Sequence, residues 1–222
     1  MPTSDYHHIS DVLHIVEQTG ADTVLDVGVG IGTWGMLCRQ VLDVYRGRVK
    51  VCEWTTKLEG IEIFDGYKNP LWDLAYDQIH LGDAFELIDS LGRYELILAC
   101  DVIEHFDKRH GMLLVEKLLQ HGDLVILTTP RGPAPQGPAW NNPHEEHKSA
   151  WSEEDFLNVP HLYKDIGFTF MTVLSLDEAA LRKIDLRRPL DILGVKKSAA
   201  ELLRLFTRRL KLRLNGHLVS NS

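Results

Sequence analysis

The chain has 222 residues, of which 44% are hydrophobic and 25% are charged, and it contains three cysteines. These proportions are typical of a soluble protein with one large core, and they exclude a disordered chain, a collagen-like repeat and a disulfide scaffold. The first residues do not form a secretory signal and no apolar run reaches membrane-spanning length, so we expect a cytoplasmic protein. Cys38, Cys52 and Cys100 lie in apolar surroundings without CxxC spacing, and we expect them to be buried, reduced thiols.

Charge is divided unevenly along the chain. Residues 182–222 contain 11 Lys and Arg against three acidic residues and carry a net charge of +8, whereas residues 1–181 carry −16. Phosphate contacts require a basic patch, so the acidic body argues against nucleic acid as a partner.

Short β-branched and apolar runs alternate with segments of helical period. This alternation predicts an α/β fold, a doubly wound and mostly parallel sheet with helices on its faces. The predicted strands are Thr23 to Val27, Gly60 to Phe64, Gln78 to Leu81, Glu95 to Cys100, Leu124 to Thr129 and Phe168 to Leu174. Apolar residues at helical spacing predict a helix from Trp34 to Tyr45 and another from Lys108 to Gln120.

Two later segments have a different character. Arg131 to Trp140 is rich in Pro and Gly, which predicts an irregular loop after the fifth strand, a position where loops often carry function. Ser152 and Asp155 have the spacing of a capping box and predict the start of a helix.

A glycine-rich turn follows the first predicted strand, in the run Val24-Leu-Asp-Val-Gly-Val-Gly-Ile-Gly-Thr-Trp-Gly35. Glycines allow a ligand to approach the backbone closely, and the start of the next helix offers N–H groups to a negative group, so the pattern predicts a nucleotide site. Gly30-Ile-Gly32-Thr-Trp-Gly35 also fits the dinucleotide fingerprint of NAD-binding proteins. Asp26 argues against NAD, because an apolar strand holds a carboxylate only for a specific role.

Over residues 20–175 the sequence resembles the class I S-adenosylmethionine-dependent methyltransferases. The resemblance rests on ordered segments: Asp26-Val-Gly28-Val-Gly30-Ile-Gly32, Gly60-Ile-Glu62-Ile, Leu81-Gly-Asp83-Ala84-Phe, Tyr94 to His105, and His121 to Pro130. It implies a Rossmann-like methyltransferase fold with S-adenosylmethionine as cofactor. The glycine loop would then contact the methionine part, Glu62 the ribose hydroxyls, and Asp83 and the next backbone N–H the adenine. The implied cofactor-binding residues are Asp26, Gly28, Gly30, Gly32, Glu62, Asp83, Ala84 and Asp101.

Glu53 is an alternative ribose ligand, since a dinucleotide fold places this carboxylate about 20 residues after the glycine loop. We favour Glu62, because its surroundings form the better buried strand. The residues between the glycine loop and Glu62 would then be an insertion.

The catalytic candidates face the position of the transferred methyl group. They are Asp101, Glu104 and His105 after the fourth strand, and His144 and His147 in the loop after the fifth. Methyl transfer needs an in-line nucleophile and often a base, and His titrates near neutrality. We therefore expect transfer to a hydroxyl oxygen of a small-molecule or saccharide acceptor, with His105 or His147 as the base and Asp101 beside it.

The segment from Asn142 to His147 contains two His and two Glu, which could also bind a metal ion. Its spacing is loose, so we expect no metal but a loop that contacts the acceptor, with Trp140 or Trp151 as an apolar wall. Two other functions stay open: an NAD-binding oxidoreductase, and a non-catalytic cofactor-binding scaffold whose tail binds a partner.

We expect two parts in the chain, a methyltransferase domain over residues 1–177 and a basic helical extension over residues 178–222. Within the extension, residues 196–214 have the pattern of a basic amphipathic helix. Such a helix can lie on an anionic membrane, which would place the protein peripherally at the inner face. It can equally dock on the acidic body.

Overall fold

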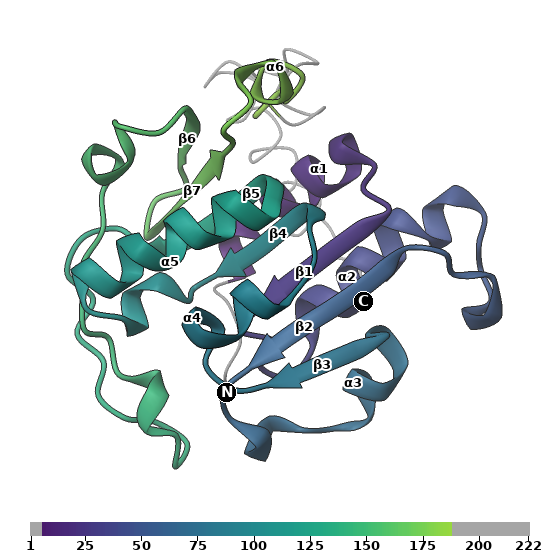
Figure 1. The fold of residues 1–222 in the computed structure, drawn as a ribbon, viewed down its shortest axis with the longest axis horizontal. Helices are drawn as coiled ribbons and strands as arrows, with labels where there is room; N and C mark the ends of the chain where they lie inside the picture. Colours follow the sequence, from purple (N-terminus) through teal and green to yellow (C-terminus); the bar gives the residue numbers. More distant parts are fainter. Residues whose placement is uncertain (1–5, 188–222) are drawn as a thin grey trace, which may run out of the picture. The chain divides into compact units, whose positions relative to one another are not determined.

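The structure is a computed structural model that describes residues 6–187. Its centre is a seven-stranded sheet with strand order β3-β2-β1-β4-β5-β7-β6 (Figure 1). The strands are β1 (Thr23–Val27), β2 (Lys57–Glu62), β3 (Gln78–Leu81), β4 (Tyr94–Cys100), β5 (Gly122–Pro130), β6 (His161–Asp165) and β7 (Thr169–Leu174). The first five strands pair in parallel, and β7 is antiparallel to both of its neighbours. The predicted doubly wound, mostly parallel sheet is therefore confirmed.

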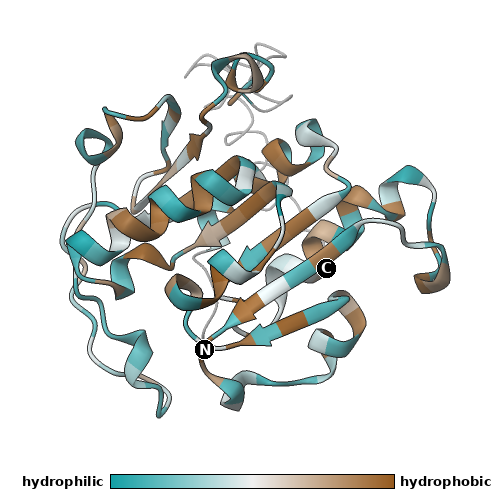
Figure 2. Cartoon of the chain, in the orientation of Figure 1, coloured by the Kyte–Doolittle hydropathy of each residue, from teal (hydrophilic) through white to brown (hydrophobic). Residues whose placement is uncertain are grey.

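Helices cover both faces of this sheet. They are α1 (Ile9–Thr19), α2 (Thr33–Leu42), α3 (Pro70–Ala75), α4 (Ala84–Leu87), α5 (Lys108–His121) and α6 (Glu178–Leu181). One hydrophobic core lies between the sheet and α1, α2, α3 and α6, and the other between the sheet and α4 and α5. Figure 2 shows the apolar strands enclosed by helices that alternate between hydrophobic and hydrophilic residues. This arrangement buries the central strands β1, β4 and β5 on both sides, as the apolar runs in the sequence predict.

The sheet differs from the prediction at two strands. β2 begins at Lys57, three residues earlier than predicted, because its residues pair with β1 from Thr23 onward. It ends at Glu62, where the side chain accepts the Phe64 N–H and the chain turns. The sequence analysis missed β6 altogether, because this edge strand pairs only with β7 and mixes polar with apolar residues.

Two local predictions need correction. Cys38 and Cys100 are buried, but Cys52 is exposed, because the 3-10 turn Val51–Glu53 lies in the loop between α2 and β2. Ser152 and Asp155 do form a capping box, but the helix that follows is only the short 3-10 turn Glu153–Phe156.

The packed body continues past residue 177, where the sequence analysis placed the start of the extension. Leu181 is buried, and Ile184 and Leu186 pack against the core beside α1 and α2. Residues 196–214, with the predicted amphipathic helix and its membrane contact, lie outside the described residues. Within residues 6–187, no helix combines the length and the apolar character that crossing a bilayer requires.

Candidate active site

A cavity of about 990 Å³ opens at the carboxyl edge of the parallel strands. The segments that follow β1, β2, β3 and β4 line it, together with the loop after β5. In open α/β sheets, ligands bind at this edge, where the direction of strand order reverses. Here the reversal lies between β1 and β4.

The glycine loop forms one wall of the cavity. Gly28, Gly30 and Gly32 have φ angles of 79°, 54° and 89°, a left-handed conformation that favours glycine. A Cβ atom on Gly28 would lie 2.7 Å from a methyl carbon of Val102. Gly28 and Gly30 line the cavity, whereas Gly32 is the N-cap residue of α2 and lies outside the lining.

Asp26 lies behind this loop and not on the cavity surface. Its carboxylate accepts a hydrogen bond of 2.5 Å from the Tyr76 hydroxyl, which in turn accepts one of 3.0 Å from the Gly35 N–H. Burial raises the pKa of Asp26 to about 7, against the lowering effect of the Tyr76 hydrogen bond. In this structure, Asp26 thus fixes the start of α2 through Tyr76.

Glu62 lies at the end of β2 and lines the cavity. One carboxylate oxygen accepts the Gly30 N–H at 2.7 Å and the other accepts the Phe64 N–H at 2.9 Å. Burial raises the pKa of this carboxyl, although both hydrogen bonds lower it. Glu53, the alternative ribose ligand, lies in an exposed turn against Lys50 and does not line the cavity.

The turn after β3 brings Asp83 and Ala84 to the same cavity. One carboxylate oxygen of Asp83 accepts the Phe85 N–H at 2.8 Å and so caps α4. Asp83 is therefore a helix cap and a cavity residue at once.

The turn after β4 begins at Asp101, whose φ of 56° is rare for a residue other than glycine. Its carboxylate accepts a hydrogen bond of 3.2 Å from the Thr128 hydroxyl and lies 3.6 Å from Nε2 of His8. The sequence analysis missed His8, because the residues before β1 contain no motif that singles it out. Asp101 lines the cavity between the glycine loop and the loop after β5.

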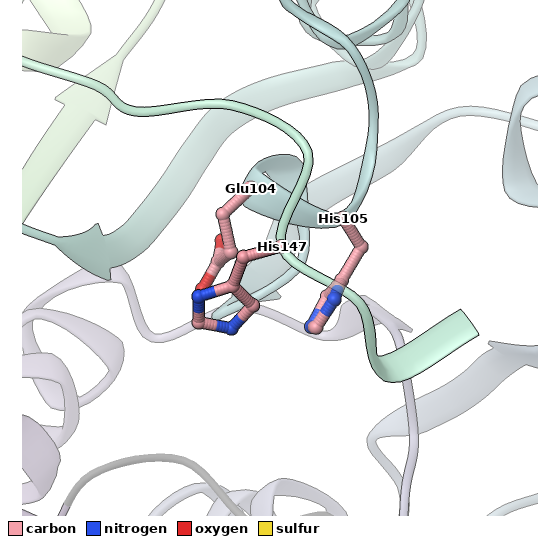
Figure 3. Close-up of side chains that lie close together, drawn as sticks. All are labelled: Glu104, His105 and His147. Atoms are coloured by element: carbon pink, nitrogen blue, oxygen red, sulfur yellow. The ribbon is translucent and has the colours of Figure 1, made fainter. Parts of the chain in front are cut away.

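Glu104, His105 and His147 come together beside this turn, and we call them the Glu-His-His cluster (Figure 3). One carboxylate oxygen and one ring nitrogen from each His lie within 4.8 Å of one another. Burial, with Asp101 nearby, raises the pKa of Glu104, and burial lowers the pKa of His105. The predicted residues Asp101, His105 and His147 thus share one end of the cavity. His144 is exposed and lines the cavity elsewhere.

The loop after β5 is held to the far side of the cavity by Tyr67. The Tyr67 hydroxyl donates a hydrogen bond of 2.6 Å to Glu145 and accepts one of 3.1 Å from Asn142. The sequence analysis did not identify Tyr67, which lies in a short 3-10 turn without a motif. Of the two predicted wall residues, Trp140 lines the cavity, whereas Trp151 is buried in the core against Phe156.

No family profile and no curated protein matches the sequence. Solved structures do match. The methyltransferase domain of the bacterial CtHen1 (CtHen1-CN) is 15% identical, over 76% of this chain and 97% of that chain, with a TM-score of 0.51. An O-methyltransferase family protein from Burkholderia thailandensis is 12% identical, over 74% of this chain and 55% of that chain, with a TM-score of 0.53. Human N-acetylserotonin methyltransferase in complex with SAM is 12% identical, over 75% of this chain and 51% of that chain, with a TM-score of 0.50. The chain therefore has the Rossmann-like fold of these methyltransferases.

Proposed function

We propose that this protein is an S-adenosylmethionine-dependent methyltransferase that acts on a hydroxyl oxygen of a small-molecule or saccharide acceptor. One observation carries the proposal: the glycine loop, Glu62 and Asp83 end three adjacent strands and line one cavity. The complex of the human neighbour with SAM supports this cofactor for the shared fold.

Each part of the cavity has a role in holding the cofactor. The backbone at Gly30 admits the methionine part, because glycine leaves this part of the cavity wall without a side chain, while the absence of a side chain on Gly28 makes room for Val102. Glu62 accepts hydrogen bonds from the ribose hydroxyls, and Asp83 with the Ala84 N–H binds the adenine. Asp26 acts as a positioning residue, since its hydrogen bond to Tyr76 connects it to the first turn of α2 and not to the cavity.

The reaction takes place at the end of the cavity near Asp101. The acceptor oxygen attacks the methyl carbon, the carbon–sulfur bond breaks, and its electron pair turns the sulfonium into a neutral thioether. The hydroxyl must lose its proton, and the Glu-His-His cluster lies where that hydroxyl would be activated. Positioning supplies much of the lowering of the barrier in such a transfer.

The neighbour from Burkholderia thailandensis supports oxygen as the methyl acceptor, because it is described as an O-methyltransferase. Trp140, in the loop after β5, offers a flat apolar surface to the cavity, and aromatic surfaces suit sugar rings and small planar molecules. No observation of the cavity favours NAD.

The test is to incubate the purified full chain with methyl-labelled S-adenosylmethionine and a fractionated extract of small molecules and saccharides. We expect one labelled fraction whose label is stable as an ether, together with S-adenosylhomocysteine. Gly30→Ala should reduce the labelling at low cofactor concentration by at least about tenfold, because the added methyl group enters the proposed space of the cofactor. Cofactor binding without any labelled product would instead support the non-catalytic scaffold.

A further inference from the structure

We propose that Glu104, His105 and His147 bind one divalent transition-metal ion, and that this ion activates the acceptor hydroxyl. The role in activation rests on the proposed methyl transfer, whereas the binding of the ion does not. The ligand set is two imidazoles and one carboxylate, which in proteins holds divalent ions such as Fe²⁺ and leaves coordination positions open for substrate. The three ligand atoms lie within 4.8 Å of one another, and the side chains converge in Figure 3.

The Glu104 carboxylate is the first independent sign of a missing cation. Its side chain is only 2% exposed, and within residues 6–187 no hydrogen bond of ordinary geometry reaches either oxygen, although the Thr129 hydroxyl lies close enough to lower the pKa of the carboxyl. An unpaired charge in the protein interior costs several kcal/mol, so a buried carboxyl is normally paired, protonated or bound to a metal. Glu104 lines the cavity, so an ion that enters from solvent can reach it.

The second sign is the orientation of the two His rings. Nδ1 of His105 lies 3.2 Å from the Glu146 carbonyl oxygen, and Nδ1 of His147 lies 2.6 Å from the Ala134 carbonyl oxygen. A carbonyl oxygen only accepts, so each Nδ1 carries the proton and each Nε2 keeps its lone pair. Metal-binding His residues are usually held in this way, with the second ring nitrogen bonded to a backbone carbonyl or a carboxylate.

The backbone explains why these three residues meet. The N–H groups of Lys148 and Ser149 donate hydrogen bonds of 2.8 and 3.1 Å to the Glu104 carbonyl oxygen. They join the loop after β5 to the turn after β4 and bring His147 beside His105. The carboxylate of the cluster thus comes from a different segment than the sequence analysis considered, and the Glu145 carboxylate accepts a hydrogen bond from Tyr67 instead.

The ion would change how the hydroxyl loses its proton. A metal ion lowers the pKa of an oxygen bound to it, as it does for water. The hydroxyl proton then passes to a solvent water molecule, and the oxygen attacks the methyl carbon as the carbon–sulfur bond breaks. His105 and His147 would be ligands and not the proton acceptor.

The test uses the full chain after dialysis against EDTA, titrated with Co²⁺ alone and followed by calorimetry and visible absorption. We expect one Co²⁺ per chain. Glu104→Gln and His147→Ala should each weaken binding by about tenfold or more, because even loss of an outer-shell partner costs 10- to 100-fold. His144→Ala is the matched control in the same loop and should bind Co²⁺ like the wild type. No saturable binding, or equal binding by all variants, would overturn the proposal.

S-adenosylhomocysteine titrated into the same samples separates the two proposals. Binding of S-adenosylhomocysteine without any response to Co²⁺ overturns the metal site and leaves the proposed function in place. Binding of Co²⁺ without binding of S-adenosylhomocysteine supports the metal site and contradicts the proposed methyltransferase function. Circular dichroism identifies a variant that does not fold. If Glu104→Gln fails to fold, His147→Ala decides, because its side chain is only partly buried in a loop.

Discussion

The Glu62 carboxylate accepts a hydrogen bond of 2.7 Å from the Gly30 N–H and so joins the end of β2 to the glycine loop after β1. Its other oxygen accepts the Phe64 N–H at the start of the next turn. A single side chain therefore fixes the shape of the loop and presents negative charge to the cavity. We therefore expect substitution of Glu62 to weaken binding of the proposed cofactor.

Glu62→Gln should weaken binding of S-adenosylhomocysteine by about 10- to 100-fold, which corresponds to a charged hydrogen bond worth about 1.5–3 kcal/mol. The amide has one oxygen in place of two and cannot accept from Gly30, Phe64 and the ribose together. Calorimetric titration measures the change. Glu53→Gln, in the exposed turn, is the control and should bind like the wild type. Weakening by Glu53→Gln alone would assign the ribose to the other carboxylate.

Asp26→Asn should change how stability depends on pH. The pKa of Asp26 is about 7 in the folded protein against 3.8 for an ordinary Asp. The folded state thus holds a proton that the unfolded state releases, and the stabilisation is complete below about pH 3.8 and is lost as the pH rises through 7. Between pH 5 and pH 8, the wild type should lose on the order of 3 kcal/mol of unfolding free energy that Asp26→Asn does not lose. Urea unfolding at both pH values tests this, and parallel pH profiles would contradict it.

Trp140 and Trp151 should respond differently to the same substitution. Trp151 is 1% exposed and packs against Phe156, so Trp151→Ala should lower the unfolding free energy by about 3–5 kcal/mol. Trp140 is 51% exposed on the cavity, so Trp140→Ala should change stability by less than about 0.5 kcal/mol. It should instead raise KM for the acceptor about threefold to tenfold. Thermal unfolding and steady-state kinetics on both variants test these two predictions. Equal loss of stability in both variants would contradict the assignment of Trp151 to the core and Trp140 to the cavity.

The sequence predicts those parts of the site that depend on local structure. Gly28, Gly30, Glu62 and Asp83 lie at the ends of strands or within three residues after them, and parallel strands bring their carboxyl ends to one edge. The sequence names Glu104, His105 and His147 among the residues near the transferred methyl group. It does not predict that these three form a cluster without His144, because hydrogen bonds between two distant segments set the position of His147.

Two other features depend on tertiary contacts, and the local sequence pattern did not predict them correctly. β6 pairs with only one strand, so its residues need no continuous apolar run. Trp140 and Trp151 flank the same loop, and only packing against Phe156 places Trp151 in the core.

The most direct test of the account is a calorimetric titration of the full chain with S-adenosylhomocysteine and, separately, with NAD. Gly30→Ala and Gly47→Ala serve as a matched pair, because both glycines have a positive φ and alanine pays a similar backbone cost of about 1 kcal/mol at each. Of these two glycines, Gly30 lines the cavity and Gly47 does not. We predict that S-adenosylhomocysteine binds the wild type and Gly47→Ala at one site per chain, that Gly30→Ala binds it at least about tenfold more weakly, and that NAD does not bind. Binding of NAD without S-adenosylhomocysteine, or equal affinity of the two glycine variants, would contradict the assignment of this cavity.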